Sequence, residues 1–253
     1  MSVVHALICA FACFSAVPMP QIAWSDKSMR YMMAAFPLVG GLVAGCYALW
    51  YQATTILGVG PFLRGAGYAL IPLLVTGGIH MDGFADVVDA QSSHASPERK
   101  REIMKDPHTG AFASMAIAAY LLAAAGLASE LDARLMPAFF CVPVLSRCLA
   151  AIAAVTWRPS SSTGMLASIQ AAARTGTVYV CAGLIFVATA GAMVACAPVP
   201  SVVALAASGV VLWWVKRFSI RDFGGMSGDL VGFFIQATEL AMLACIAFVG
   251  KVA

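Results

Sequence analysis

Three carboxylates at a regular spacing are the clearest chemical feature of the chain. Asp82, Asp86 and Asp89 stand at positions i, i+4 and i+7, so a helix over this segment places all three on one face. Carboxylates about 6 Å apart repel each other by roughly 3 kcal/mol at an effective dielectric constant of about 20. A divalent cation relieves this repulsion, because Mg²⁺, Mn²⁺ and Ca²⁺ prefer oxygen ligands. Raised pKa values or hydration at a membrane surface would relieve it without a metal.

The surrounding segment, residues 77–110, holds six of the twelve acidic residues, four of the fifteen basic residues and three of the four histidines. His80 can orient a phosphate or transfer a proton, and the alternative is an interfacial histidine without a role. Ser96 is expected to be the N-cap of a short basic helix that ends at Lys105. Lys105 is a candidate phosphate ligand, although basic helices also lie solvated or on anionic headgroups. Asp106 is expected to be the N-cap of the next helix or part of a phosphate site at that helix N-terminus, and both roles can hold together.

Two charged residues fall inside apolar segments. Arg147 is a planar bidentate donor that suits a phosphate or a partner carboxylate. Glu239 is expected to lie well inside the bilayer, where a carboxylate requires a charged partner, and Arg147 is the candidate. Just before the last apolar segment, Gly224, Gly225 and Gly228 let backbone amides approach a ligand closely, and the following helix N-terminus favours phosphate. Asp229 is either a further metal ligand or a favourable charge in a first helical turn.

Composition predicts the class of protein that positions these groups. The chain has 253 residues, of which 61% are hydrophobic and 11% are charged, whereas about a quarter of residues are charged in soluble domains. Its charges stand in short clusters between apolar runs of the length that crosses a bilayer, about 20 residues. We therefore predict an all-α polytopic transmembrane helical bundle of about seven or eight spans, forming one domain over residues 1–253.

The first apolar run is short and could be re-entrant or interfacial, and the third requires Arg64 to snorkel at its end. The expected helices cover residues 2–17, 32–57, 61–79, 111–129, 135–156, 176–197, 199–215 and 230–250.

Basic residues between these runs predict the orientation. If all eight cross, the 80–110, 157–175 and 216–229 loops share a side with eleven basic residues, and three basic residues lie on the other side. The positive-inside rule makes the first side cytoplasmic, so we expect a bacterial cytoplasmic (inner) membrane protein whose active site faces the cytoplasm. The eleven are Lys27, Arg30, Arg99, Lys100, Arg101, Lys105, Arg158, Arg174, Lys216, Arg217 and Arg221, and the three are Arg64, Arg134 and Lys251.

Three passages resemble the cobalamin 5′-phosphate synthase family, also called the adenosylcobinamide-GDP ribazoletransferases. They are TGGIHMDGFADVVDA at 76–90 with ERKREIMKDPHTGAF at 98–112, SRCLAA at 146–151, and GGMSGDLVGFFIQATEL at 224–240. The first passage is specific to the family, and the resemblance covers the full length of the chain. Gln236 stands where the family commonly has glutamate, and Ser227 keeps a hydroxyl where threonine is common.

The resemblance implies a Mg²⁺-dependent membrane transferase that joins adenosylcobinamide-GDP to α-ribazole or its 5′-phosphate and releases GMP. The expected partners are these substrates and the lipid bilayer, with no nucleic acid, and a homo-oligomer is left open. The implied catalytic and metal residues are Asp82, Asp86, Asp89, His80 and Asp229, with Asp89 as the expected proton acceptor. The implied substrate-binding residues are Lys105, Asp106, Gly110, Arg147, Gly224, Gly225, Ser227, Gly228 and Glu239.

Two other interpretations compete with this one. A CDP-alcohol phosphotransferase also places aspartates at the ends of membrane helices, but the spacing from Asp82 to Asp86 breaks its pattern, and the second half of that pattern does not follow. A cation transporter would place acids near the middle of several spans, whereas here they cluster at one edge.

Overall fold

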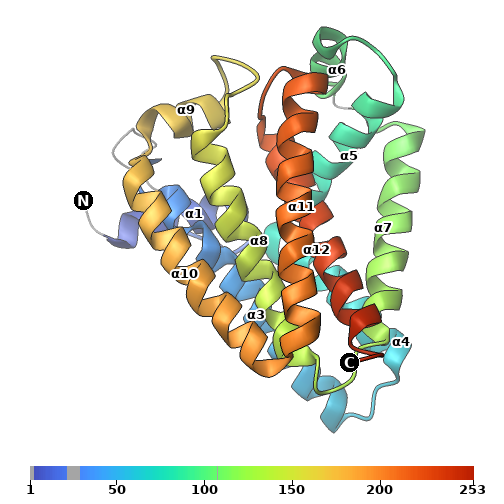
Figure 1. Cartoon of the computed structure of the whole chain (residues 1–253). Helices are drawn as coiled ribbons and strands as arrows, with labels where there is room; N and C mark the ends of the chain where they lie inside the picture. The colour runs from blue at the N-terminus through green and yellow to red at the C-terminus, as the bar shows by residue number, and fades with distance from the viewer. Residues whose placement is uncertain (1–2, 22–28, 107) are drawn as a thin grey trace.

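The computed structural model describes residues 3–21, 29–106 and 108–253, which fold into eleven helices arranged as one bundle (Figure 1). Lys27, one of the expected cytoplasmic basic residues, lies outside the described residues. The helices are α1 Val3–Phe14, α3 Met32–Ile56, α4 Pro61–Thr76, α5 Ile79–Ser92, α6 Pro97–Ile103, α7 Ala111–Ser129, α8 Met136–Thr156, α9 Met165–Ala172, α10 Thr175–Cys196, α11 Pro198–Phe223 and α12 Gly228–Val249.

The helical membrane bundle predicted from composition is confirmed. Within the described ranges, six helices are long and apolar enough to cross a bilayer, namely α3, α7, α8, α10, α11 and α12, and a bent pair, α4 with α5, raises the number to seven. The first expected span is the 12-residue helix α1, which is too short to cross because a span needs about 20 residues. Without α1, the described residues provide at most seven spans, in place of the eight that were possible from the sequence.

The third expected span differs most from its prediction. Helix α4 ends at Thr76, and α5 leaves it at an angle of 99°. Gly77 and Gly78 form the bend with φ of +64° and +79°, a left-handed conformation that glycine adopts without steric cost. The helix that carries the three aspartates therefore forms the second arm of a bent pair and packs against α12 and α7.

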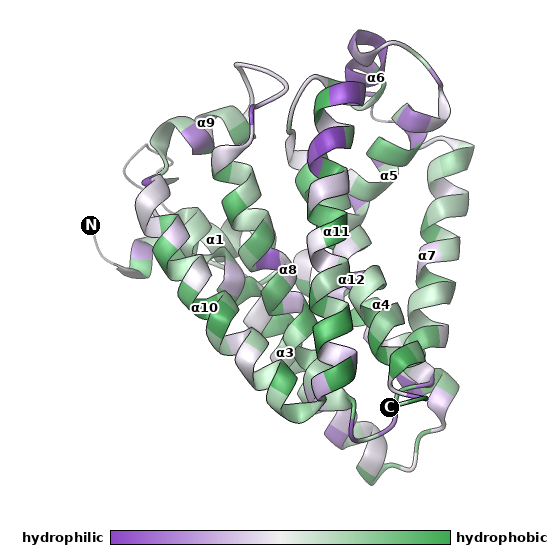
Figure 2. Cartoon of the chain, in the orientation of Figure 1, coloured by the Kyte–Doolittle hydropathy of each residue, from purple (hydrophilic) through white to green (hydrophobic). Residues whose placement is uncertain are grey.

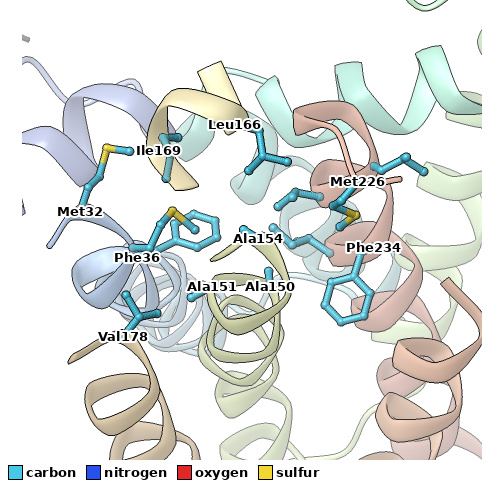
Figure 3. Close-up of a cluster of buried hydrophobic side chains, with 14 of the residues drawn as sticks. Met32, Phe36, Ala150, Ala151, Ala154, Leu166, Ile169, Val178, Met226 and Phe234 are labelled. Atoms are coloured by element: carbon cyan, nitrogen blue, oxygen red, sulfur yellow. The ribbon is translucent and has the colours of Figure 1, made fainter. Parts of the chain in front are cut away.

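Small side chains on α8 bring several helices together in one half of the bundle. Figure 3 shows Ala150, Ala151 and Ala154 of α8 surrounded by larger apolar side chains, among them Phe36 of α3 and Phe234 of α12. All five side chains are fully buried. Because alanine presents only a methyl group, the neighbouring helices can approach α8 closely.

Hydrophilic residues gather at one end of the bundle. Figure 2 shows them on α6 and on the C-terminal end of α11, and Figure 1 shows α9 at the same end, with the C-terminus of the chain at the opposite end. The connections from α5 to α7, from α8 to α9 and from α11 to α12 all lie at this hydrophilic end. The expectation that the three large polar loops share one face is therefore correct.

Candidate active site

A cavity of about 530 Å³ opens among the loops of the hydrophilic end and reaches the start of α5. Helices α5, α9 and α12, the end of α6 and the loop before α9 form its walls. Its polar lining residues are His80, Asp82, Arg101, Lys105, Ser160, Ser161, Thr163, Ser227 and Asp229. Acidic and basic side chains from distant parts of the sequence thus share one cavity.

Two of the expected metal ligands meet in this cavity. Asp82 is exposed within it, and Asp229 lines it from the first turn of α12. The two carboxylates repel each other electrostatically, and Asp86 lies close enough to both to be repelled as well. The tertiary structure therefore adds Asp229 to the acidic cluster predicted on α5.

Two glycines explain why α5 and α12 approach so closely. A Cβ atom on Gly83 would lie 2.7 Å from the Cα of Asp229, and one on Gly232 would lie 2.8 Å from the carbonyl oxygen of His80. The helices therefore cross backbone against backbone, which places Asp82 beside Asp229. We did not predict this role from the sequence, although small residues are typical of close helix packing in membranes.

Replacing Gly232 by alanine is expected to lower stability by about 1–3 kcal/mol, because the added methyl group overpacks a backbone contact. Thermal unfolding of the purified protein in detergent measures this change. The matched control is Gly126→Ala, because a Cβ at Gly126 in α7 meets no atom within 4 Å. If both substitutions shifted the melting temperature equally, the close crossing of α5 and α12 would be wrong.

Helix α6 carries basic residues to the cavity. The prediction that it starts with Ser96 as N-cap is confirmed, since the Ser96 side chain accepts a hydrogen bond from the Arg99 N–H. One side of α6 is buried: the Lys100 ammonium contacts Asp222 at 3.1 Å and donates to Gln91 at 2.8 Å. Arg101 and Lys105 both line the cavity. The Arg101 guanidinium also donates to the Phe223 carbonyl oxygen at 2.9 Å and pairs with Glu98 at 3.2 Å.

The sequence offered Arg101 as one of several basic residues that could meet phosphates, with Lys105 preferred, and the structure places both at the cavity. Lys105 lies beyond the end of α6 at Ile103, so the helix is shorter than expected. Sequence reasoning missed the hydroxyl-rich segment at 160–163, which lines the cavity with Ser160, Ser161 and Thr163. A backbone contact holds that segment in place, because the Ser160 N–H donates to the Met226 carbonyl oxygen and the Met226 N–H donates to that of Arg158, both at 2.8 Å. Gly225 allows this contact, since a Cβ there would lie 2.6 Å from the Arg158 carbonyl oxygen.

Asp89 is placed differently from our expectation. Its carboxylate accepts hydrogen bonds from the Gly110 N–H at 2.5 Å and the Ala113 N–H at 2.8 Å, and it does not line the cavity. Asp89 therefore caps α7, which accounts for Gly110, where a Cβ would lie 2.6 Å from the carboxylate. In the part of the chain that the structure describes, Asp82, Asp86 and Asp89 do not form a joint metal-ligand set.

Arg147 and Glu239 pair with each other, as the sequence suggested. The Arg147 guanidinium donates to the Glu239 carboxylate, which also accepts from the Ser146 hydroxyl at 2.8 Å. Arg147 is fully buried and Glu239 is 7% exposed. Neither lines the 530 Å³ cavity, and Gln236 lies with Glu239 beside a separate pocket of about 30 Å³. The geometry shows an ion pair between these residues, while the Nε and Nη2 atoms of Arg147 have no hydrogen-bond partner among the described residues.

Three other expected site residues have local structural roles. Asp106 is exposed and accepts the His108 N–H at 3.0 Å, which holds the pKa of Asp106 below its ordinary value. The N-cap expectation for Asp106 is wrong, because α7 begins at Ala111 with Gly110 as its N-cap. Gly224 ends α11 in a left-handed conformation, and Ser227 caps α12 by accepting the Leu230 N–H at 3.2 Å.

His80 is nearly fully buried but contributes to the cavity wall. Its ring lies 5.8 Å from that of Phe36 and 6.4 Å from that of Phe14, measured between centroids. Its Nε2 atom has no hydrogen-bond partner among the described residues. A buried polar atom without a partner costs free energy, so a hydrogen bond from a ligand to this nitrogen would be favourable.

The carboxylates of the cavity suit a metal ion whose coordination is completed by oxygen atoms of the substrate. Among the described residues, no three His, Cys, Asp or Glu side chains converge on one point. Mg²⁺ is, however, usually held by one or two carboxylates together with substrate phosphates. Asp82 and Asp229 provide two carboxylates on one cavity wall, and Lys105 and Arg101 provide cations for phosphate oxygens. These residues therefore fit Mg²⁺ bound with a diphosphate.

The fold and the cavity define a class: a polytopic helical membrane protein whose internal cavity combines carboxylates and cations, a combination suited to phosphoryl transfer. The model of the cobalamin-5-phosphate synthase family matches residues 6–247. The chain belongs to this family, which favours the resemblance stated above over the CDP-alcohol phosphotransferase and cation-transporter alternatives.

Several relatives carry the name adenosylcobinamide-GDP ribazoletransferase. The protein of Lachnoclostridium phytofermentans is 36% identical over 243 residues, which cover 95% of this chain and 92% of that protein. That of Geobacillus kaustophilus is 33% identical, covering 92% and 91%, and that of Nitratidesulfovibrio vulgaris is 34% identical, covering 88% of each. No solved structure matches the chain.

Proposed function

We propose that this chain joins adenosylcobinamide-GDP to α-ribazole or its 5′-phosphate and releases GMP. A ribose hydroxyl oxygen bonds to the phosphorus that carries the corrinoid arm, the bond from that phosphorus to GMP breaks, and the hydroxyl proton passes to a base. The observation that carries this proposal is the meeting of Asp82 and Asp229 with Lys105 and Arg101 in one cavity of a chain that matches the family over residues 6–247.

The cavity residues perform the positioning and charge stabilisation on which phosphoryl transfer depends. Lys105 and Arg101 neutralise phosphate oxygens, and the N-terminal end of α12, beginning at Gly228, adds backbone N–H donors and a favourable dipole. Asp82 and Asp229 would hold Mg²⁺, which when bound neutralises the charge of the diphosphate. We assign the proton transfer to His80 in place of Asp89, because His80 lines the cavity and has an unpartnered Nε2 atom.

The membrane setting is part of the proposal. We infer that the chain lies in the bacterial cytoplasmic membrane with its hydrophilic end toward the cytoplasm. This orientation follows from the positive-inside rule, because Arg99, Lys100, Arg101 and Lys105 lie on or next to α6 at that end.

Direct turnover tests the activity. Purified protein in lipid nanodiscs, given adenosylcobinamide-GDP, α-ribazole 5′-phosphate and Mg²⁺, is expected to release GMP and form one cobamide for each GMP. Addition of EDTA is expected to stop the reaction and excess Mg²⁺ to restore it, because a diphosphate without a metal keeps its full negative charge. Absence of GMP with both substrates present would reject the proposed function, and turnover unchanged in EDTA would reject the metal.

The proton acceptor can be identified separately. His80→Gln is expected to lower kcat by about 10²–10⁴-fold, the usual contribution of general acid–base catalysis. Asp89→Asn is expected to keep kcat within about tenfold and to lower the melting temperature, since it weakens a cap worth about 0.5–2 kcal/mol. Steady-state kinetics and thermal unfolding of the two variants distinguish the roles. The reverse pattern would return the base to Asp89.

A further inference from the structure

A second cavity, of about 640 Å³, lies between α4, α5 and α7. Apolar side chains dominate its lining, among them Leu73, Leu74 and Ile117. Asp82 and Ile79 belong to its wall and also to the wall of the 530 Å³ cavity. The two cavities therefore meet at the first turn of α5, with a proposed metal ligand at the junction. We call the second cavity the α4–α5–α7 groove.

The bend between α4 and α5 keeps this groove open. Gly77 and Gly78 line it, and a Cβ added to Gly78 would meet no atom within 4 Å. The same addition at Gly77 would meet only the Cβ of Ala16, at 3.7 Å. Because neither glycine has a side chain, nothing projects from the bend into the space beside Asp82. Leu74, which is 74% exposed, is a further apolar wall residue of the groove.

The size of the first cavity limits what it can hold. At about 530 Å³ it falls within the range of about 300–1,000 Å³ that is typical of a site for one drug-sized ligand. Its charged side chains suit a diphosphate, and its apolar wall area suits the nucleoside groups on either side of the reacting phosphorus. Adenosylcobinamide-GDP also carries a corrin macrocycle, joined through an arm to the diphosphate. When the diphosphate lies at Asp82, the macrocycle needs a second, adjoining space.

We propose that the α4–α5–α7 groove binds the corrinoid part of adenosylcobinamide-GDP, while the diphosphate lies at Asp82 where the two cavities join. This assignment rests on the proposed function. The shared wall residues Asp82 and Ile79 support it, because the two cavities adjoin on the same turn of α5. Arg101, Lys105 and Asp229 line only the 530 Å³ cavity, which therefore suits the diphosphate. Of the residues that the structure describes, Asp82 is the one charged side chain that lines the groove, and the apolar rest of the groove wall suits the rim of a macrocycle. A lipid acyl chain is the competing occupant.

Narrowing the groove tests the assignment. Ile117→Trp on α7 and Leu74→Trp on α4 both place a larger ring in the groove, and neither residue lines the 530 Å³ cavity. Each is expected to raise the KM for adenosylcobinamide-GDP about tenfold, which corresponds to about 1.4 kcal/mol of lost binding. The KM for α-ribazole 5′-phosphate and the inhibition constant of free GDP are expected to stay within about twofold, since those molecules occupy the other cavity.

The control is Leu122→Trp, which adds the same ring to α7 at a position that is 72% exposed and outside the groove. Wild-type protein that releases no GMP would reject the proposed function, and this assignment with it. Wild-type turnover with an unchanged KM for adenosylcobinamide-GDP in both groove variants would reject the assignment alone and favour a lipid in the groove. An equal rise in all three constants would also overturn it, because it would indicate a general distortion.

Discussion

Asp82→Asn is expected to abolish turnover while the protein stays folded in the membrane. Asp82 is the carboxylate shared by both cavities, and its partner Asp229 alone would be left to hold Mg²⁺ against the diphosphate. Removing a charge that stabilises the transition state costs at least about 10²–10³-fold in kcat. GMP release by the purified variant measures the loss. The melting temperature should not fall, because the exposed Asp82 side chain is repelled by its neighbours in the metal-free protein.

The matched control is Asp132→Asn. Asp132 is an exposed aspartate whose partner is Arg134, in the connection between α7 and α8. The Asp132→Asn variant should keep full activity, which would show that loss of a carboxylate elsewhere in the chain is harmless. Activity retained in Asp82→Asn would remove Asp82 from the metal site, and the proposed mechanism would then fail.

Arg147→Met is expected to lower stability by about 3–5 kcal/mol, because it leaves the Glu239 carboxylate buried without its partner. For a chain of this size, that loss corresponds to a fall in melting temperature of roughly 6–20 °C. The double substitution Arg147→Met with Glu239→Leu should recover most of it, since apolar side chains of similar volume can replace a buried ion pair. Thermal unfolding in detergent compares the wild type, the two single variants and the double variant.

Kinetics of the same double variant separates a structural pair from a substrate contact. If Arg147 and Glu239 act through packing, the stabilised double variant should turn over with a KM for adenosylcobinamide-GDP within about threefold of wild type. Recovery of stability without recovery of activity would show that one of them contacts substrate, as the family resemblance first implied. Failure of the double variant to regain stability would contradict the ion pair itself.

The sequence determined the class of protein and the location of its chemistry. Long apolar runs between clusters of charge can be satisfied only as helices in a bilayer, so the helical bundle was predictable. Local signals are equally direct: Ser96 before a proline fixed the start of α6, and the depth of Arg147 demanded a partner, which Glu239 supplies. These inferences succeed because they depend on solvation and on neighbours within one or two helical turns.

Only the tertiary structure decided which of the polar residues share a cavity. The i, i+4, i+7 spacing predicted one set from Asp82, Asp86 and Asp89, but spacing does not specify what lies opposite a helix face. Asp89 accepts hydrogen bonds from backbone N–H groups at the start of α7. Helix α12 places Asp229 beside Asp82, because Gly83 and Gly232 have no side chains to keep the two helices apart. Close approach of two backbones is a property of both helices together, so it cannot be read from either segment alone.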